Sequence, residues 1–515
     1  MSLLDDVSLM ITPNGVSRNV LFGVLPTPTF SYEKIDLTSG ATSEPSEWGS
    51  ITTNGIKKLT SSATTYYETG FTVTTGKTYE ASFTLSDYSG SSTMGFSNQG
   101  GVPSSIRLSG NGSVSGYFTA TANAQLQLYG LSTNTGTFSN VSVKEVTTSD
   151  MDFTRATSAT RVNPSGLVDG ITTGLPRLDY RVSESCPHIL VEPERTNICL
   201  RSEELDNASW TKSNGGTGSA PVVTANDIVS PDGTQNADKV VFDLNGGTAL
   251  GDHSYLSQTY TQTADTYTIS CYLKGASGGE KIFLDFDSAN SNIATLTTDW
   301  VRYTFTKAVT STGSTTIRIG LRGGVTSTDN PTIYMWGCQL EKAAYATSYI
   351  PTTSTSITRN GDRFTKKGIS DLINSSEGVL YIEMAALVDA QTYRIISLSD
   401  GTEDQRVYIQ YTNASQTVAG VIKRNGVTQA NMSYTLTDET AFSKIAVKWK
   451  EDDFALWVDG TERGTDSAGN TPIGLNSLQF DNGKATAANF FYGKVRNLQL
   501  YKTALSDTQL GALTS

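Results

Sequence analysis

Residues 78–85 read TYEASFTL, and this stretch carries the clearest structural signal in the sequence. Its apolar residues, Tyr79, Ala81, Phe83 and Leu85, occupy alternate positions, with polar residues between them. Successive side chains of a β-strand point to opposite faces, so the alternation predicts a strand with one buried and one solvated face. Such a sheet buries its apolar face against a second layer, so the stretch favours a β-sandwich.

The same pattern recurs along the chain. Residues 265–271 (DTYTISC) match residues 77–83 (KTYEASF) in position and pattern, which indicates a weak internal duplication. Residues 378–384 (GVLYIEM) alternate in the last part of the chain. Only 17% of the 515 residues are charged, and turn residues recur at short intervals between strand-favouring runs. A chain of this length needs more than one core, so the predicted class is all-β with tandem β-sandwich domains.

We expect six segments along the chain. They are a leader (1–27), a first jelly-roll sandwich (28–148), a folded connector (149–197), a second jelly roll (198–347), an extended strap (348–366) and a C-terminal sandwich (367–515). The leader either docks on another protein or adds a strand to the first sandwich. Residues 187–193 are expected to pack on a neighbouring domain or subunit. Ser506 is expected to cap a short helix.

Charge and hydropathy limit the partners. The net charge of −12 and the sequence pI near 4.8 favour solubility and oppose binding to a nucleic-acid backbone. No segment is apolar enough to span a membrane, and the N-terminus lacks the features of a signal peptide. We therefore expect no nucleic-acid partner, no membrane insertion and assembly in a cytoplasm.

The four cysteines form no CxxC pair, and in a reducing compartment the expectation is free, buried thiols. They are Cys186, Cys199, Cys271 and Cys338. A metal site from Cys186, His188 and Cys199 would lack a fourth ligand and the usual spacing. The metal interpretation is therefore not favoured.

Signals for catalysis are weak. The only histidines are His188 and His253, and no GxSxG motif precedes a helix. Asp285 and Asp287 lie at strand spacing, as a glycosidase pair could. Of the three roles that this pair could have, we rank solvated strand residues first, calcium ligands second and catalytic carboxylates third. No enzymatic activity and no cofactor are expected.

Sugar binding uses aromatic faces beside amide and carboxylate groups. Four residues of the C-terminal segment are candidates for binding a ligand. Trp457 and Asp459 lie in a strand-Asp-Gly-strand hairpin, where Trp457 is either an exposed platform or part of a second core layer. Tyr393 and Arg394 follow a predicted loop and could line a rim. The remaining candidates, Trp48, Trp210 and Trp300, are expected to anchor sandwich edges.

Residues 153–200 contain four short motifs in order. They are RATSATRV (155–162), GLV (166–168), PRLDY (176–180) and LVEPERTN (190–197). This series resembles a segment that recurs in tail-fibre-like virion proteins of tailed bacteriophages. The leader and the strap resemble the same proteins. The closing strand of the first jelly roll (138–146) and the entry strand of the second (203–212) resemble those of carbohydrate-binding modules. Residues 456–515 resemble a concanavalin-like domain of laminin-G type.

The resemblance implies a structural virion protein, assembled in the host cytoplasm and exposed on the particle. A tail fibre of this kind would form a homotrimer and dock on other virion proteins through its leader. Its C-terminal sandwich would be the distal contact for a host-surface glycan or envelope protein. Family analogy also allows Ca²⁺ in the C-terminal domain, although no acidic cluster is dense enough to name ligands. Two alternatives stay open: a capsid-bound head fibre or decoration protein, and a tailspike-like polysaccharide depolymerase.

Overall fold

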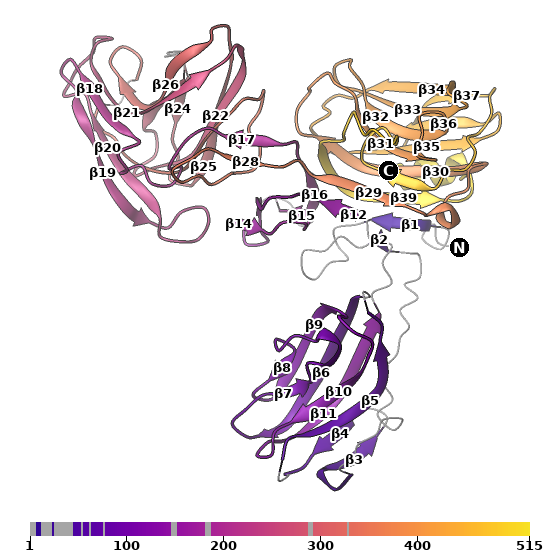
Figure 1. Cartoon of the computed structure of the whole chain (residues 1–515). Helices are drawn as coiled ribbons and strands as arrows, with labels where there is room; N and C mark the ends of the chain where they lie inside the picture. Colours follow the sequence, from indigo (N-terminus) through magenta and orange to yellow (C-terminus); the bar gives the residue numbers. More distant parts are fainter. Residues whose placement is uncertain are drawn as a thin grey trace. The chain divides into compact units, whose positions relative to one another are not determined.

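The structure is a computed structural model that describes residues 7–11, 23–24, 45–52, 55–60, 63–75, 78–145, 152–180, 187–286, 292–326 and 329–515 (Figure 1). The chain divides into two compact units, residues 24–149 and residues 1–23 with 150–515. The described residues form β-strands, short turns of 3-10 helix and one α-helix, α1 (Asp507–Thr514). None of the described helices is long and apolar enough to cross a bilayer. The predicted all-β, multidomain sandwich class is confirmed.

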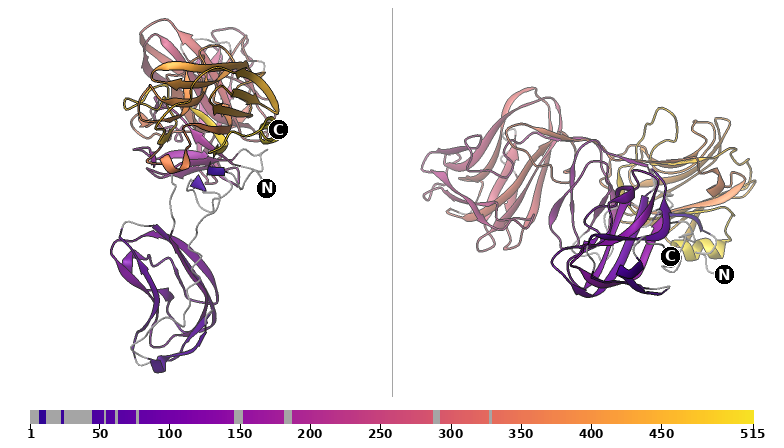
Figure 2. Two further views of the ribbon diagram at one scale, coloured as in Figure 1. Left: turned by 90° about the vertical axis from the view of Figure 1, so that its right-hand side faces the viewer. Right: turned by 60° about the horizontal axis from the view of Figure 1, so that its bottom comes forward.

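The first unit is a jelly-roll sandwich, whose layers Figure 2 shows from two sides. One sheet has the order β3-β4-β11-β6-β9 and the other β5-β10-β7-β8. The alternating residues of β6 are no more than 1% exposed, so the strand predicted from residues 78–85 is confirmed. The strands are β3 (Trp48–Thr52), β4 (Gly55–Lys58), β5 (Thr65–Val73), β6 (Thr78–Ser89), β7 (Met94–Phe96), β8 (Arg107–Leu108), β9 (Gly112–Thr119), β10 (Ala124–Gly130) and β11 (Thr135–Glu145).

The second jelly roll repeats this topology. Its sheets have the orders β19-β20-β27-β22-β25 and β18-β21-β26-β23-β24. When β3 to β11 are matched with β19 to β27 in chain order, both sheets coincide strand for strand, and β18 is an added edge. The internal duplication is therefore confirmed at the level of topology. The strands are β18 (Thr211–Gly215), β19 (Ser219–Ile228), β20 (Ala237–Asp243), β21 (His253–Gln262), β22 (Asp265–Gly275), β23 (Lys281–Phe286), β24 (Ile293–Thr295), β25 (Val301–Val309), β26 (Gly313–Arg322) and β27 (Thr332–Glu341).

The C-terminal sandwich collects strands from distant parts of the sequence. One sheet has the order β15-β16-β39-β30-β35-β36-β37, with β1 paired to β39 and β2 paired to β1, and the other β12-β29-β38-β31-β32-β33-β34. The strands are β1 (Val7–Ile11), β2 (Gly23–Val24), β12 (Asp152–Thr154), β15 (Arg177–Asp179), β16 (His188–Val191), β29 (Arg363–Lys367), β30 (Glu377–Ala386), β31 (Arg394–Ser399), β32 (Arg406–Tyr411), β33 (Thr417–Arg424), β34 (Val427–Thr435), β35 (Ser443–Lys450), β36 (Phe454–Val458), β37 (Thr461–Asp466), β38 (Ser477–Gln479) and β39 (Gly493–Tyr501).

The leader supplies β1 to this sandwich. β1 pairs antiparallel with β39, and Leu9 and Ile11 join the main core of the C-terminal sandwich. The hydroxyl of Ser8 donates to the carbonyl of Leu500 at 3.0 Å. The expectation that the leader adds a strand to the first sandwich is therefore wrong for residues 7–11. The partner strand lies at the other end of the chain, where no local pattern reveals it.

The connector and the strap also contribute strands. β16 pairs with β39, which confirms that residues 187–193 pack on a neighbouring domain. In the strap, β28 (Ile357–Arg359) pairs with β17 (Arg195–Asn197), and β29 begins at Arg363, so the segment is less of a free strap than expected. Between them, β13 (Ala159–Val162) and β14 (Val168–Ile171) form a hairpin. Both jelly rolls thus lie in the sequence between strands of the C-terminal sandwich.

Candidate functional site

Trp457 belongs to a second core layer of the C-terminal sandwich. Its side chain is only 9% exposed and clusters with Tyr381 and Leu510. α1 packs against β36 on this side, and the right view of Figure 2 shows α1 as the yellow coil. Ser506 caps α1 as predicted, because its hydroxyl accepts from the backbone of Gln509. The exposed-platform interpretation of Trp457 is therefore wrong, and the core interpretation is confirmed.

Asp459 is a turn residue. It sits between β36 and β37 with a φ of 48°, followed by Gly460 with a φ of 75°. Two consecutive positive φ values are typical of the tightest hairpin turns. The Asp459 carboxylate accepts from the backbone N–H of Lys444 at 2.8 Å. Asp459 therefore stabilises the hairpin turn through its described contacts.

Tyr393 and Arg394 line one cleft, as predicted, but in different ways. The cleft has a volume of about 340 Å³ and also includes Tyr345 and Arg195. Tyr393 is 43% exposed, whereas Arg394 is buried and donates to the carboxylate of Glu439 at 2.6 Å. Arg394 is thus occupied by an internal ion pair, and Tyr393 is the residue that a ligand would meet.

The described cysteines are free and buried, as expected; they are Cys199, Cys271 and Cys338. Burial raises the pKa of the Cys338 thiol, which keeps it protonated. Cys186 lies outside the described residues. Among the residues that the structure describes, no group of three or more His, Cys, Asp or Glu side chains is arranged to hold a metal ion. The expectation of Ca²⁺ in the C-terminal domain stays a prediction, and no Ca²⁺ site is used below.

Asp285 is not a solvated strand residue. Its carboxylate is fully buried and accepts from Arg318 Nε at 3.1 Å and from Nη2 at 3.0 Å. The solvated interpretation, ranked first from the sequence, is wrong here because this bidentate pair balances the charge inside the protein. Asp287 lies outside the described residues.

The predicted tryptophan anchors occupy structural positions. Trp48 and Trp210 are at most 2% exposed, and the indole N–H of Trp300 donates to the carbonyl of Val229 at 3.1 Å. We therefore looked elsewhere for an accessible aromatic surface.

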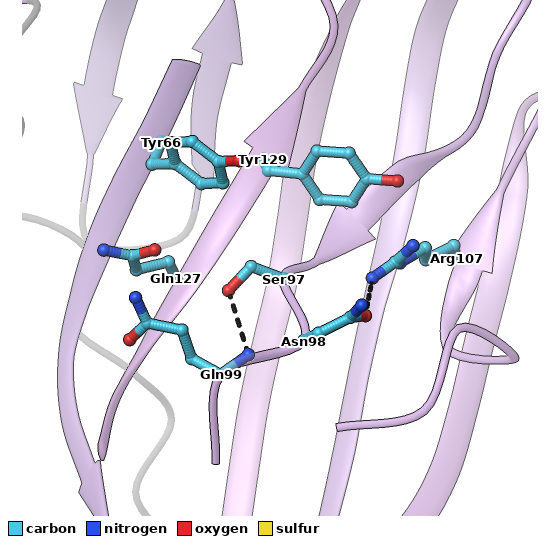
Figure 3. A pocket seen from close by; sticks show the side chains of 7 residues that line it. All are labelled: Tyr66, Ser97, Asn98, Gln99, Arg107, Gln127 and Tyr129. Carbon is cyan, nitrogen blue, oxygen red and sulfur yellow. Dashed lines mark hydrogen bonds between the residues drawn. The ribbon is translucent and has the colours of Figure 1, made fainter. Parts of the chain in front are cut away.

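The first jelly roll carries such a surface on the outer face of its four-stranded sheet. In β5 and β10, Tyr67, Leu126 and Leu128 point into the core. Because side chains alternate along a strand, Tyr66 and Tyr129 face outward. They line a cleft of about 640 Å³ (Figure 3). The full lining consists of Tyr66, Ser97, Asn98, Gln99, Arg107, Gln127 and Tyr129.

The two tyrosines form an aromatic platform. Tyr66 and Tyr129 are direct cross-strand partners, with ring centroids 6.4 Å apart and planes inclined by 28°. Tyr66 is 44% exposed. The hydroxyl of Tyr129 lies 3.0 Å from the hydroxyl of Thr93, which helps to fix the ring. The platform therefore offers aromatic surface to a ligand while one of its rings is held in place.

Polar groups line the cleft beside this platform. Arg107 Nε donates to the carbonyl of Phe96 at 3.1 Å, and Nη2 donates to the amide oxygen of Asn98. The guanidinium carbon lies 4.7 Å from the ring centroid of Tyr129. A Cβ at Gly95 would lie 2.6 Å from the carbonyl oxygen of Ile106, so the glycine permits β8 to approach and present Arg107. Figure 3 shows the amides and Arg107 along one side of the two rings.

Some residues of this cleft could have been predicted from the sequence. Gln127 and Tyr129 alternate with the apolar residues Leu126 and Leu128, and this alternation is visible in the sequence. What the sequence lacks is the register that places Tyr66 opposite Tyr129, because the two strands are not neighbours in the chain. Arg107 lies in a strand of two residues, which is too short for a periodic pattern.

The motif series of the connector builds a buried ion network. Arg177 Nη1 and Arg359 Nη1 donate to Glu192 Oε2 at 2.6 and 2.7 Å. Arg155 Nη1 donates to Asp362 Oδ1 at 2.9 Å, and Arg177 also pairs with Asp362. Burial alone would raise the pKa of Glu192, but the Arg359 and Arg177 guanidinium groups hold it well below its ordinary value. These motif residues therefore join the connector to the strap.

The comparisons with known proteins concern parts of the chain. A sequence profile described as the Concanavalin A-like lectin/glucanases superfamily, Laminin_G_3, matches residues 380–511. It confirms the predicted concanavalin-like, laminin-G type domain at the C-terminus. The search of curated proteins finds no match.

Several solved structures resemble parts of the fold. The CBM40 of Ruminococcus gnavus IT-sialidase bound to α2,3-sialyllactose shares 19% identity over 28% of this chain and 84% of that chain, with a TM-score of 0.25. Domain 4 of the Geobacillus stearothermophilus arabinanase AbnA with arabinotriose shares 12% identity over 33% and 82%, with a TM-score of 0.24. Mouse laminin alpha1 domains LG4-5 share 10% identity over 57% and 94%, with a TM-score of 0.21. At these scores the likenesses carry no functional argument.

Proposed function

We propose that this chain is a non-enzymatic structural protein of a tailed-phage particle, a tail fibre or appendage that binds a glycan on the host surface. The observation that carries the binding role is the cleft on the first jelly roll, with Tyr66 and Tyr129 beside amide groups and Arg107. The virion role is supported by the resemblance of the motif series in residues 153–200. The arginine and glutamate side chains of those motifs are engaged in the buried ion network between the connector and the strap. We therefore assign the ligand to the cleft and not to the motifs.

The cleft suits a sugar ring for chemical reasons. The rings of Tyr66 and Tyr129 can pack on the apolar face of a sugar. The side-chain amides of Asn98, Gln99 and Gln127 can exchange hydrogen bonds with sugar hydroxyls. One such shallow site binds weakly, and several copies on one particle raise the effective affinity. We propose a homotrimer, by analogy with phage fibres, which would supply several copies of the cleft. Mass photometry of the full chain should then give three times the mass of one chain.

The leader keeps a proposed docking role toward other virion proteins. Val7, Leu9 and Ile11 are buried in the C-terminal sandwich, so β1 itself is already engaged. Docking would then use other residues of the leader. A host envelope protein is the alternative to a glycan as the binding partner.

Two exposed tyrosines test the binding role. Tyr66 and Tyr393 are 44% and 43% exposed and line the two clefts described above. We expect Tyr66→Ala to weaken binding of the full chain to host cells or glycans by about tenfold, because stacking area is lost. Tyr393→Ala tests the cleft of the C-terminal sandwich and should leave binding unchanged, whereas a loss of binding would move the ligand to that cleft. Val427→Ala is the control, because Val427 is 61% exposed and lines neither cleft. Equal binding by the Tyr66→Ala variant and the natural chain would contradict the assignment of the ligand to the cleft of the first jelly roll.

Placement and the absence of catalysis have their own tests. Electron microscopy of particles labelled with an antibody to this chain should show label on the tail, and label on the head would contradict the tail-fibre role. Host polysaccharide incubated with the chain should keep its length. Shortening would contradict the non-enzymatic role.

A further inference from the structure

Arg107 is the only charged residue among the described residues that line the cleft. Its described hydrogen bonds go to the carbonyl of Phe96 and the amide oxygen of Asn98, and neither partner carries a charge. These bonds use two of the five N–H groups of a guanidinium, so three donors are left for a ligand. The two bonds and the Tyr129 ring hold the guanidinium in one orientation.

The second jelly roll provides an internal comparison. Arg318 of β26 lies on the outer face of the equivalent sheet, 5.8 Å from the ring centroid of Tyr255. Arg318 and Arg107 are not at equivalent positions, because Arg107 lies on β8, which corresponds to β24. The guanidinium of Arg318 pairs bidentately with the buried carboxylate of Asp285. In the described part of the first jelly roll, Arg107 forms no ion pair with any carboxylate. Among the described residues, the second jelly roll supplies a carboxylate to an arginine beside a tyrosine, and the first supplies none to Arg107.

We propose that the cleft of the first jelly roll selects a carboxylated glycan, whose carboxylate pairs with Arg107 while its sugar ring packs on Tyr66 and Tyr129. The proposal rests on the proposed glycan-binding function of the same cleft. A planar guanidinium matches a carboxylate with two parallel hydrogen bonds, which an ester or a neutral sugar cannot reproduce at full strength. The net charge of −12 opposes non-specific binding of polyanions, so the selection depends on local pairing.

The experiment uses the full chain and matched glycans. Oligogalacturonate, hyaluronan oligosaccharide and sialyllactose are immobilised, each beside its methyl ester. At least one acid should bind about tenfold or more tightly than its ester, because a charge-assisted hydrogen bond is lost in the ester. R107Q should remove this difference, and R107K should keep part of it as a point charge. K57Q removes an exposed charge from the other sheet of the same domain and should change nothing.

Binding of the same variants to host cells completes the test. Loss of cell binding in both Tyr66→Ala and R107Q, with unchanged melting temperatures, supports the proposal. If R107Q binds cells as the natural chain does while Tyr66→Ala does not, carboxylate selection is overturned and glycan binding stands. Equal binding of acids and esters has the same consequence. If the natural chain binds neither the glycans nor the cells, both the selection and the proposed function fail.

Discussion

At the scale of single residues, Arg177 shows why the connector motifs have their composition. Its guanidinium is fully buried and contacts both Glu192 and Asp362. A buried arginine is tolerated only when carboxylates balance its charge, so the motif residues and the strap residues depend on each other. Arg359 and Asp362 of the strap complete the same network.

Glu192 makes the stability of this joint depend on pH. The folded state holds the pKa of Glu192 well below its ordinary value of 4.5, so its stabilisation is present above about pH 4.5. That stabilisation is lost as the pH falls through the lower, folded-state pKa. We expect Glu192→Gln to cost about 3–5 kcal/mol at pH 7, because it leaves buried guanidinium groups unbalanced. The cost should shrink as the pH falls below 4.5, because Glu192 then becomes protonated in the unfolded natural chain while it stays charged in the folded chain, and this lowers the stability of the natural chain.

Urea unfolding of both proteins at a series of pH values measures this effect. Lys342→Ala is the control, because Lys342 and Asp265 form an ion pair whose side chains are 48% and 51% exposed. It should change the free energy of unfolding by less than about 1 kcal/mol. A cost for Glu192→Gln that stays constant down to the lowest pH would show that Glu192 is not the titrating group.

At the scale of elements, strands with one solvated face could be predicted, and their partners could not. The alternation in residues 78–85 was sufficient for β6. The sequence of β36, FALWV, is apolar at every position and does not show which face is buried. Trp457 is buried because residues of other elements, such as Tyr381 of β30 and Leu510 of α1, cover it. For the candidate site, local periodicity identifies outward residues such as Tyr129, whereas the cleft depends on register between distant strands.

The strand β1 shows how strong such a distant contact is. Leu9 is fully buried in the main core of the C-terminal sandwich, although it lies near the N-terminus. We expect Leu9→Ala to lower the stability of this sandwich by about 2–5 kcal/mol, as for other buried leucines. Val427→Ala is the control in the same sandwich, because Val427 is 61% exposed. Thermal unfolding of the full chain measures both changes, and equal melting temperatures for both variants would contradict the pairing of β1 with β39.

At the scale of the whole molecule, the C-terminal sandwich is built from strands that are far apart in the sequence. It takes strands from the leader, the connector and the strap, and each jelly roll is inserted between two of these strands. Insertion is tolerated when the inserted module has its own core. The core of the first jelly roll consists entirely of residues from 48 to 143, so this condition is met.

The separate core predicts a separate unfolding transition. Phe83 is 1% exposed in the first jelly roll, and Phe83→Ala should cost that module about 3–5 kcal/mol. In calorimetry of the full chain, we expect this variant to lower one transition and to leave the transition of residues 150–515 in place, because the two compact units have separate cores. Leu9→Ala should do the reverse. If either substitution shifts all transitions together, the two units unfold as one, and the stability of the binding cleft would then depend on the C-terminal sandwich.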